Sequence, residues 1–375
     1  MLGARAAYGR FTSTAMVANM LHRLTLSQVR RETADAVSLV FDIPKALAGR
    51  FVFTPGQYLT LEAEIEGERV RRSYSICSGL DDGEIRVAVK EVEGGRFSSF
   101  ANRSLTAGGI LGVMEPRGRF IVPPARKKGR VFLAVVVGSG ITPVLSIART
   151  VLAREPDSQF VLVCGNRKQR DILFRSQIDK LAKDFAPRLL VRHVLSREPD
   201  RAGLLQGRID GGKLAAILGE CAVPISAIDH ALLCGPPEMV AHLSASLHAA
   251  GLAPSKIHAE SFHAAAAPVK ASPNASQEAE DSSRQIEIRL GGRSFVISAR
   301  PAETIVDAAR RTGVKVPYSC GGGTCGSCVA KIVDGSADTV PDAVLEPWER
   351  EAGLVLTCQS RPGTGGVVVD YDAAF

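Results

Sequence analysis

The 375-residue sequence has no apolar run long enough to cross a membrane, so it predicts no membrane span. It also has no run of lysine and arginine and no basic patch interleaved with aromatic residues, so its net charge of +7 does not indicate a nucleic-acid partner. A solvated basic surface that helps to dock acidic partners or anionic cofactors is the simpler interpretation. With 45% hydrophobic residues, the chain has the composition of a globular protein of two or three domains.

The sequence has only eight cysteines, and a disulfide framework is not expected, because a chain of this length does not need one to stabilise its core. Four of the eight lie near the C-terminal end, and the others are scattered at Cys77, Cys164, Cys221 and Cys234. Scattered cysteines are typical of a reducing compartment, and we expect a cytoplasmic protein. We interpret the first three of them as small buried hydrophobes.

The C-terminal cysteines follow the spacing C-x4-C-x2-C, at Cys320, Cys325 and Cys328, with Cys358 after a further 29 residues. This is the plant-type pattern for binding a [2Fe–2S] cluster through four thiolates. Glycines between the cysteines allow positive φ angles and leave backbone N–H groups free to point at sulfur. A structural zinc site is the alternative, but its ligands usually come as two C-x2-C-like pairs and only one is present. The sequence therefore predicts a chain that handles single electrons.

The N-terminal third has two parts. Residues 1–20 contain Arg5 and Arg10 and no acidic residue, as in a transit peptide, but we interpret them as a disordered extension or an upstream start. From residue 21 to about residue 125, short β-type runs alternate with Gly, Pro and Asp turns, and no helical period intervenes. This predicts an antiparallel β-barrel, with strands expected at 36–42, 57–63, 70–76 and 84–89.

The polar run Arg72-Ser73-Tyr74-Ser75 is either a merely structural strand or a flavin-binding one. Arg72 would neutralise a phosphate, Tyr74 would stack on the ring system and Ser75 would hydrogen-bond a ring nitrogen. A glycine turn further along strengthens the second interpretation, because it presents N–H groups and a hydroxyl to a phosphate. This segment contains Lys90, Val92, Gly95, Arg96, Phe97 and Ser98.

The pattern changes after residue 130. A continuous apolar run at 131–137 predicts a central parallel strand, followed by Gly138, Gly140, Thr142 and Pro143 and a helical pattern to residue 155. Such a strand–turn–helix unit aims helix N–H groups at a phosphate, although an ordinary βα turn has the same pattern. Further strand-like runs at 160–164, 189–195 and 230–234 alternate with helices, which predicts a doubly wound α/β domain.

Ligands in such sheets bind at the carboxyl ends of the strands. Ser196 and Arg197 follow one strand, and Arg208 lies eleven residues beyond Arg197. A cation with a hydroxyl suits the 2′-phosphate of NADPH, whereas a free 2′-hydroxyl favours an acidic acceptor. We predict NADPH; in the alternative, NADH binds, Glu198 contacts its ribose and Arg197 is a solvated loop residue.

A further loop at the same edge contains Cys234, Gly235 and Pro236. Cys234 is expected on the nicotinamide side, or it is a buried cysteine with only a packing role. Three loops at one edge of a sheet indicate a ligand site more specifically than any one of them.

Residues 264–283 are small, polar and proline-containing, which predicts a flexible linker. A hairpin at 286–290 and 294–298 and a helix at 304–311 are expected to precede the cysteine motif. We therefore expect a flavin barrel at 21–125, a nucleotide domain at 126–263, the linker, and a [2Fe–2S] domain at 284–375.

These motifs, in this order, resemble the ferredoxin–NADP reductase superfamily with a C-terminal plant-type ferredoxin domain. Residues 72–75 resemble its R-x-Y-S flavin motif, 95–98 its pyrophosphate turn, 138–143 its nucleotide phosphate loop and 234–237 its C-G-P-P turn. Glu260 and Phe262 are similar to the E-x-aromatic segment that ends the reductase module. The resemblance implies a ferredoxin domain of the α+β, β-grasp type. Gly108-Gly109 departs from the usual Gly-Asp before the last barrel strand.

The motifs and the resemblance together give a set of site residues. Ser75, Cys234 and Glu260 are the expected catalytic residues, and Cys320, Cys325, Cys328 and Cys358 are the expected cluster ligands. The expected cofactor contacts are Arg72, Ser73, Tyr74, Ser75, Lys90, Val92, Gly95, Arg96, Phe97, Ser98, Gly138, Gly140, Thr142, Pro143, Ser196, Arg197, Arg208, Cys234, Gly235, Pro236 and Phe262.

A nicotinamide gives two electrons as hydride and a [2Fe–2S] cluster takes one, so a flavin is needed between them. FAD is expected, although FMN-binding relatives share parts of the pattern. The nearest subgroup in pattern is the reductases of phenylacetyl-CoA epoxidases and related oxygenases, which implies an oxygenase acceptor. Reductases of a hybrid-cluster protein, a ketosteroid hydroxylase or a desaturase are the alternatives, and a non-enzymatic redox sensor is an alternative of another class.

Overall fold

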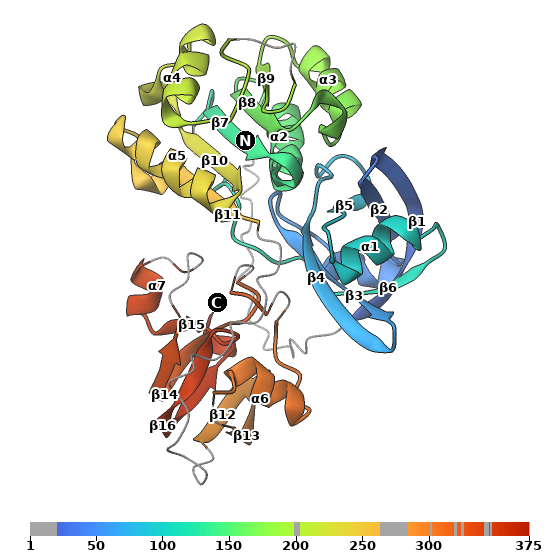
Figure 1. The fold of residues 1–375 in the computed structure, drawn as a ribbon, viewed down its shortest axis with the longest axis vertical. Helices are drawn as coiled ribbons and strands as arrows, with labels where there is room; N and C mark the ends of the chain where they lie inside the picture. Colours follow the sequence, from blue (N-terminus) through green and yellow to red (C-terminus); the bar gives the residue numbers. More distant parts are fainter. Residues whose placement is uncertain are drawn as a thin grey trace, which may run out of the picture.

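The computed structural model describes residues 21–125, 127–198, 203–262, 284–300, 302–318, 321–323, 326–340, 345 and 347–374. The chain forms three β-sheets in three bodies, coloured blue to cyan, green to yellow, and orange to red in Figure 1. The predicted extension at 1–20 and the predicted linker lie outside the described residues. Within the described part of the chain, no helix is both long and apolar enough to cross a membrane.

The first sheet has the strand order β4-β3-β6-β1-β2-β5, and neighbouring strands are antiparallel. Its strands are β1 (His22–Thr33), β2 (Ala36–Asp42), β3 (Tyr58–Ile65), β4 (Glu68–Ser75), β5 (Ile85–Lys90) and β6 (Ile110–Val113). Side chains alternate between the core and solvent along β1, where Leu24 and Leu26 are fully buried. A bridge between Ile76 and Val87 joins the two end strands, so the sheet closes into the predicted barrel.

The expectation that no helix interrupts the barrel region is wrong. Helix α1 (Arg96–Arg103) packs on the barrel, and only four of its eight residues are buried. Phe97 and Ala101 enter the barrel core. Two turns are too short to show a helical period above the surrounding strand pattern, so tertiary packing decides this helix.

The second sheet is parallel, with the strand order β11-β10-β7-β8-β9. Its strands are β7 (Val131–Val137), β8 (Gln159–Asn166), β9 (Leu189–Leu195), β10 (His230–Gly235) and β11 (Ile257–Ser261). Helices α2 (Ile141–Arg154) and α3 (Arg175–Asp184) cover one face, and α4 (Gly211–Glu220) and α5 (Pro237–Ala249) cover the other (Figure 1). Because both faces are covered, β7 is apolar throughout, as the predicted doubly wound domain requires.

The third sheet has the order β13-β12-β16-β14-β15, with β12 and β16 parallel. Its elements are β12 (Arg284–Leu290), β13 (Arg293–Ala299), α6 (Ile305–Arg311), β14 (Val329–Thr339), α7 (Pro347–Glu351), β15 (Leu354–Leu356) and β16 (Ser360–Asp370). Gly291 and Gly292 both have positive φ angles and turn the predicted hairpin. The Thr304 hydroxyl accepts a hydrogen bond from the Asp307 N–H and caps α6.

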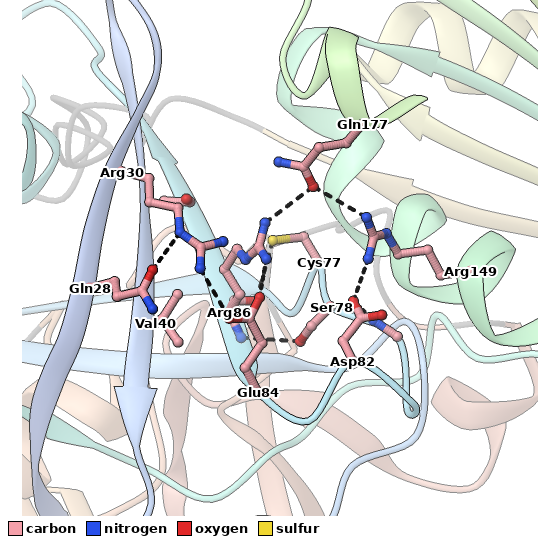
Figure 2. Close-up of polar contacts among 12 residues, drawn as sticks. Gln28, Arg30, Val40, Cys77, Ser78, Asp82, Glu84, Arg86, Arg149 and Gln177 are labelled. Carbon is pink, nitrogen blue, oxygen red and sulfur yellow. Dashed lines mark hydrogen bonds and ion pairs between the residues drawn. The ribbon is translucent and has the colours of Figure 1, made fainter. Parts of the chain in front are cut away.

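The barrel and the α/β domain meet between β5 and helices α2 and α3. Arg86 Nη1 and Arg149 Nη2 both donate to Gln177 Oε1, at 3.1 and 3.3 Å, so one amide oxygen bridges the two bodies (Figure 2). The Ser146 hydroxyl donates to the Ser78 carbonyl oxygen at 2.6 Å. These contacts join the barrel to helices α2 and α3 of the α/β domain.

Candidate functional site

The side chains of the R-x-Y-S motif lie on two opposite sides of strand β4. Arg72 and Tyr74 pair across the sheet with Leu61 and Leu59, which belong to the barrel core, so they lie on the core-facing side of β4. The Tyr74 ring lies 5.5 Å from the Phe97 ring of α1, centroid to centroid. Burial raises the pKa of the Tyr74 hydroxyl. Strand β4 and α1 therefore meet at the two predicted flavin motifs.

Ser73 and Ser75 lie on the opposite side of β4. The hydroxyls of Ser73 and Thr60 are 3.1 Å apart across the β3–β4 pairing. Ser75 is buried and pairs directly with Tyr58. The two serines therefore face away from the core, toward the side on which the C-terminal domain lies.

The glycine turn before α1 is tightly built. A Cβ at Gly95 would approach Ser98 Oγ to 2.4 Å and the Val92 carbonyl oxygen to 2.9 Å, so only glycine fits there. The Ser98 hydroxyl donates to the Gly95 carbonyl oxygen and accepts from the Val92 N–H. It therefore stabilises the turn, and what the turn offers to a phosphate is the first-turn N–H groups of α1.

Two other predicted flavin contacts have partners inside the barrel. Lys90 forms an ion pair with Asp35 at 3.3 Å. Arg96 bonds Glu68 at 2.5 Å and the Ile65 carbonyl oxygen at 2.7 Å, which ties α1 to the β3–β4 hairpin.

The predicted nucleotide phosphate loop forms the 3-10 turn η2 (Gly138–Gly140), and α2 follows at once. A Cβ at Gly140 would come within 2.3 Å of the Cys234 carbonyl oxygen, so β10 and this turn touch only because the residue is glycine. Thr142 and Pro143 are buried in the first turn, and the Thr142 hydroxyl donates to the Ser139 carbonyl oxygen. The first turn of α2 has no acidic residue, so its N–H groups remain suited to an anion.

Cys234 and Glu260 lie side by side at the ends of β10 and β11. Glu260 is partly exposed, but its Oε2 atom is enclosed and has no hydrogen-bond partner among the described residues. Burial raises the pKa of Glu260 to about 8. Burial and the Glu260 carboxylate raise the pKa of the Cys234 thiol well above its ordinary value, so the thiol is neutral. The Phe262 N–H donates to the Gly235 carbonyl oxygen, and Pro236 caps α5.

The predicted 2′-phosphate loop follows β9. The Ser196 and Arg197 N–H groups donate to the carbonyl oxygens of Asn166 and Arg167, which leaves both side chains exposed. The segment 205–207 returns beside Leu195, so exposed Arg208 comes back to the end of β9. The Glu198 carboxylate accepts a hydrogen bond from the Gln169 N–H at 3.4 Å.

Two of the four predicted cluster ligands, Cys328 and Cys358, lie in the described part of the chain and are buried. Cys320 and Cys325 lie outside it. The intervening Gly321, Gly323 and Gly326 have φ angles of 66°, 72° and 67°, as the glycine pattern predicts.

Hydrogen bonds from Gln359 and Thr357 support the segments that contain the two described predicted ligands. Gln359 donates to the Gly321 carbonyl oxygen at 3.1 Å and lies 3.6 Å from Cys358 Sγ, which joins the loop to the fourth cysteine. Thr357 donates to the Cys328 carbonyl oxygen from both its N–H and its hydroxyl. These bonds join the segments that carry Cys328 and Cys358 to each other and to the glycine loop.

Sequence reasoning missed Tyr58 as a site residue. Its hydroxyl lies 3.0 Å from Ser327 Oγ, across 269 residues of sequence. No local motif indicates this contact, because it forms only when the C-terminal domain packs on the barrel.

Comparison with known proteins gives three matching family models. They are the oxidoreductase FAD-binding domain at residues 23–121, the oxidoreductase NAD-binding domain at 135–245 and the 2Fe-2S iron-sulfur cluster binding domain at 288–363. One component of the 1,2-phenylacetyl-CoA epoxidase of Escherichia coli K12 is 42% identical over 355 residues, which span 94% of this chain and 98% of that one. The chain belongs to this family of reductases. It is an oxidoreductase that uses FAD, a pyridine nucleotide and a [2Fe–2S] cluster.

Other relatives align over nearly their whole length. The ferredoxin reductase component of 3-ketosteroid-9-alpha-monooxygenase from Rhodococcus rhodochrous is 33% identical over 93% of this chain and 96% of that one. The solved structure of phthalate dioxygenase reductase is 24% identical, with a TM-score of 0.56 over 93% of this chain and 98% of that one. The likeness to phthalate dioxygenase reductase concerns the fold alone.

Proposed function

We propose that this reductase passes electrons from NADPH through FAD and the [2Fe–2S] cluster to the oxygenase component of a multicomponent monooxygenase. The observation that carries the proposal is the presence of all three cofactor domains in a chain that aligns end to end with an epoxidase component at 42% identity. We further propose an acceptor of the phenylacetyl-CoA epoxidase type. The domain limits at 125 and 263 and the site residues below belong to the same proposal.

The described residues fit the three cofactors. The turns at Gly95 and Gly140 leave no room for a Cβ, Glu260 keeps an enclosed oxygen without a partner among the described residues, and Cys328 and Cys358 offer two buried thiols. A nicotinamide supplies hydride, a flavin accepts it and releases electrons singly, and a [2Fe–2S] cluster carries one electron.

We assign the flavin to the junction of β4 and α1. Arg72 would neutralise a phosphate, because its guanidinium Nη1 donates to the neighbouring Arg71 carbonyl oxygen at 2.6 Å and not to a carboxylate of the described residues. Tyr74 is held against Phe97 and would pack on the ring system. Ser75 lies on the opposite side of β4 from Tyr74 and would contact the edge of the ring system at the end of the strand.

The nicotinamide is assigned to the corner of Cys234 and Glu260. The Cys234 thiol is neutral there, and the protonated Glu260 can donate a hydrogen bond at neutral pH. Gly235, Pro236 and Phe262 would shape the approach to this corner. For the adenosine end, exposed Ser196, Arg197 and Arg208 support NADPH, and the Glu198 contact with Gln169 weakens the NADH alternative.

Replacing Cys325 by serine tests the cluster. We expect iron to fall from roughly two per chain toward zero and reduction of cytochrome c to be lost, whereas ferricyanide reduction with NADPH persists, because the flavin alone suffices for it. Cys221→Ser, at the partly exposed end of α4, is the matched control and should keep both activities. Stoichiometric zinc in anaerobically purified wild-type protein would contradict the cluster.

The acceptor is tested by supplying NADPH and purified oxygenase components. We expect product with a phenylacetyl-CoA epoxidase. Turnover with a ketosteroid hydroxylase, a desaturase or a hybrid-cluster protein but not with the epoxidase would redirect the assignment. Failure to reduce any protein acceptor would favour a redox sensor.

A further inference from the structure

Tyr58 lies between the flavin-assigned strand and the cluster loop. It begins β3 and pairs with Ser75. The Tyr58 N–H donates to the Arg117 carbonyl oxygen at 2.7 Å, and the Arg117 N–H donates to the Tyr58 carbonyl oxygen at 3.0 Å. A Cβ at Gly118 would come within 3.0 Å of the Tyr58 ring. The side chain is therefore held in place, and its hydroxyl meets Ser327, the residue before the cluster ligand Cys328.

A second contact involves the other end of the cluster loop. The Arg71 guanidinium lies 5.4 Å from the centre of the Tyr318 ring, and the Arg310 guanidinium of α6 lies 5.2 Å from it. Within the barrel, Arg71 Nε also donates a hydrogen bond to Glu62 Oε2 at 2.5 Å. Tyr318 therefore contacts a cation of the barrel and a cation of its own domain.

The third contact is an ion pair between the barrel residue Arg119 and Glu349 of α7. The Glu349 side chain is 3% exposed, whereas 44% of the Arg119 side chain is exposed. Burying a carboxylate to this extent is unfavourable unless a cation accompanies it. The barrel therefore supplies a cation to a buried carboxylate of the C-terminal domain.

We propose that Tyr58, Arg71 and Arg119 form a barrel seat that positions the cluster loop beside the Ser75 end of β4. This rests on the proposed function, which assigns the flavin to β4 and the cluster to the cysteine loop. The seat contacts Tyr318, two residues before the first cluster cysteine, and Ser327, directly before the third, so it holds the loop at both ends. The Arg119 side chain is 44% exposed, so the docked arrangement should weaken as salt screens the ion pair.

Arg119→Gln tests the seat, with Arg50→Gln as the matched control. The Arg50 side chain is 49% exposed and pairs with Glu115 at 3.0 Å entirely within the barrel. In wild-type and both variant holoproteins we would measure hydrogen exchange of peptides covering Tyr58, Ser327 and Glu349, and the radius of gyration by solution scattering. We expect faster exchange and a larger radius in Arg119→Gln only, and the same change in the wild type at high salt.

The kinetic arm compares two acceptors. Cytochrome c reduction should fall roughly fivefold in Arg119→Gln, the loss expected for one weak ion pair, while ferricyanide reduction and the flavin and iron contents stay unchanged. Tyr58→Phe and Ser327→Ala should each lower cytochrome c reduction, and the double variant should lose no more than either one. Rescue of docking by the Arg119→Glu, Glu349→Arg exchange would confirm that the pair acts through its charges.

Three outcomes separate the possibilities. Identical exchange, radius and cytochrome c rates in Arg119→Gln and Arg50→Gln would overturn the seat. Looser docking with unchanged or faster cytochrome c reduction would overturn its positioning role. Wild-type protein that lacks flavin or cluster would instead overturn the proposed function, and the exchange and scattering data would still report on docking.

Discussion

A carboxyl group and a thiol share one enclosed corner of the α/β domain, and the carboxyl controls how that corner responds to pH. Burial raises the pKa of Glu260 from 4.5 to about 8. Between these values the unfolded chain has released the proton that the folded chain still holds. The stabilising contribution of Glu260 is therefore fully present below about pH 4.5 and is lost as the pH rises to about 8.

Glu260→Gln should flatten this pH dependence. We expect the variant to match the wild type in Tm near pH 4.5 and to exceed it above pH 8, because a neutral amide cannot ionise inside the corner. Thermal unfolding of both proteins across this range is the measurement. Glu238→Gln, at an exposed position of α5, is the control and should show no such crossover. A constant difference in Tm at every pH would indicate a packing effect instead.

The exposed Arg197 side chain offers a prediction on nucleotide choice. A charge-assisted contact with a 2′-phosphate is roughly 1.5–3 kcal/mol, so Arg197→Ala should lower kcat/KM for NADPH by roughly tenfold or more. NADH lacks this phosphate, so its kcat/KM should barely change. Equal losses for both nucleotides, or a wild type that prefers NADH, would show that this loop does not bind a 2′-phosphate.

At the scale of elements, the turn between β7 and α2 depends on one close approach. Gly140→Ala would drive a methyl group into the Cys234 carbonyl oxygen, 2.3 Å away in the present geometry. Because backbone atoms on both sides must then move, we expect a lower Tm and weaker NADPH binding, measured by thermal unfolding and by titration. The control is Gly219→Ala in α4, where nothing lies within 4 Å and the added methyl should stabilise the helix by about 0.5–1 kcal/mol. Unaltered NADPH affinity in Gly140→Ala would contradict the role of this turn.

The elements also differ in how well local sequence predicts them. Strand β7 begins and ends where its apolar run does, because both of its faces are buried. Helix α1 escaped prediction because its two turns carry few buried residues. Positive φ angles in the cysteine loop were predicted correctly for Gly321, Gly323 and Gly326 but not for Gly322, because glycine adopts that region without strain but does not require it.

At the scale of the whole molecule, the orientation of the barrel on the α/β domain depends on a small polar network (Figure 2). Gln177→Leu would remove the oxygen that both Arg86 and Arg149 share, leaving two guanidinium donors without this acceptor at a mostly buried junction. We expect a loss of about 1–3 kcal/mol in stability and a lower Tm. Gln28→Leu is the matched control. The Gln28 amide oxygen accepts a hydrogen bond from Arg30 at an exposed position within the barrel. Equal effects of both substitutions would show that the junction contributes nothing beyond an ordinary surface bond.

The sequence by itself determined the three domain types, their order and the cluster motif, because glycine turns, apolar runs and cysteine spacing are local properties. It also predicts that β4, the α1 turn and the ends of β7, β9 and β10 are ligand-binding segments. Only the tertiary structure decided that Ser98 serves the turn itself, that Glu260 lies beside Cys234, and that Tyr58 meets Ser327. Such contacts join residues that local patterns do not connect, and burial shifts a pKa only once the surrounding elements have packed.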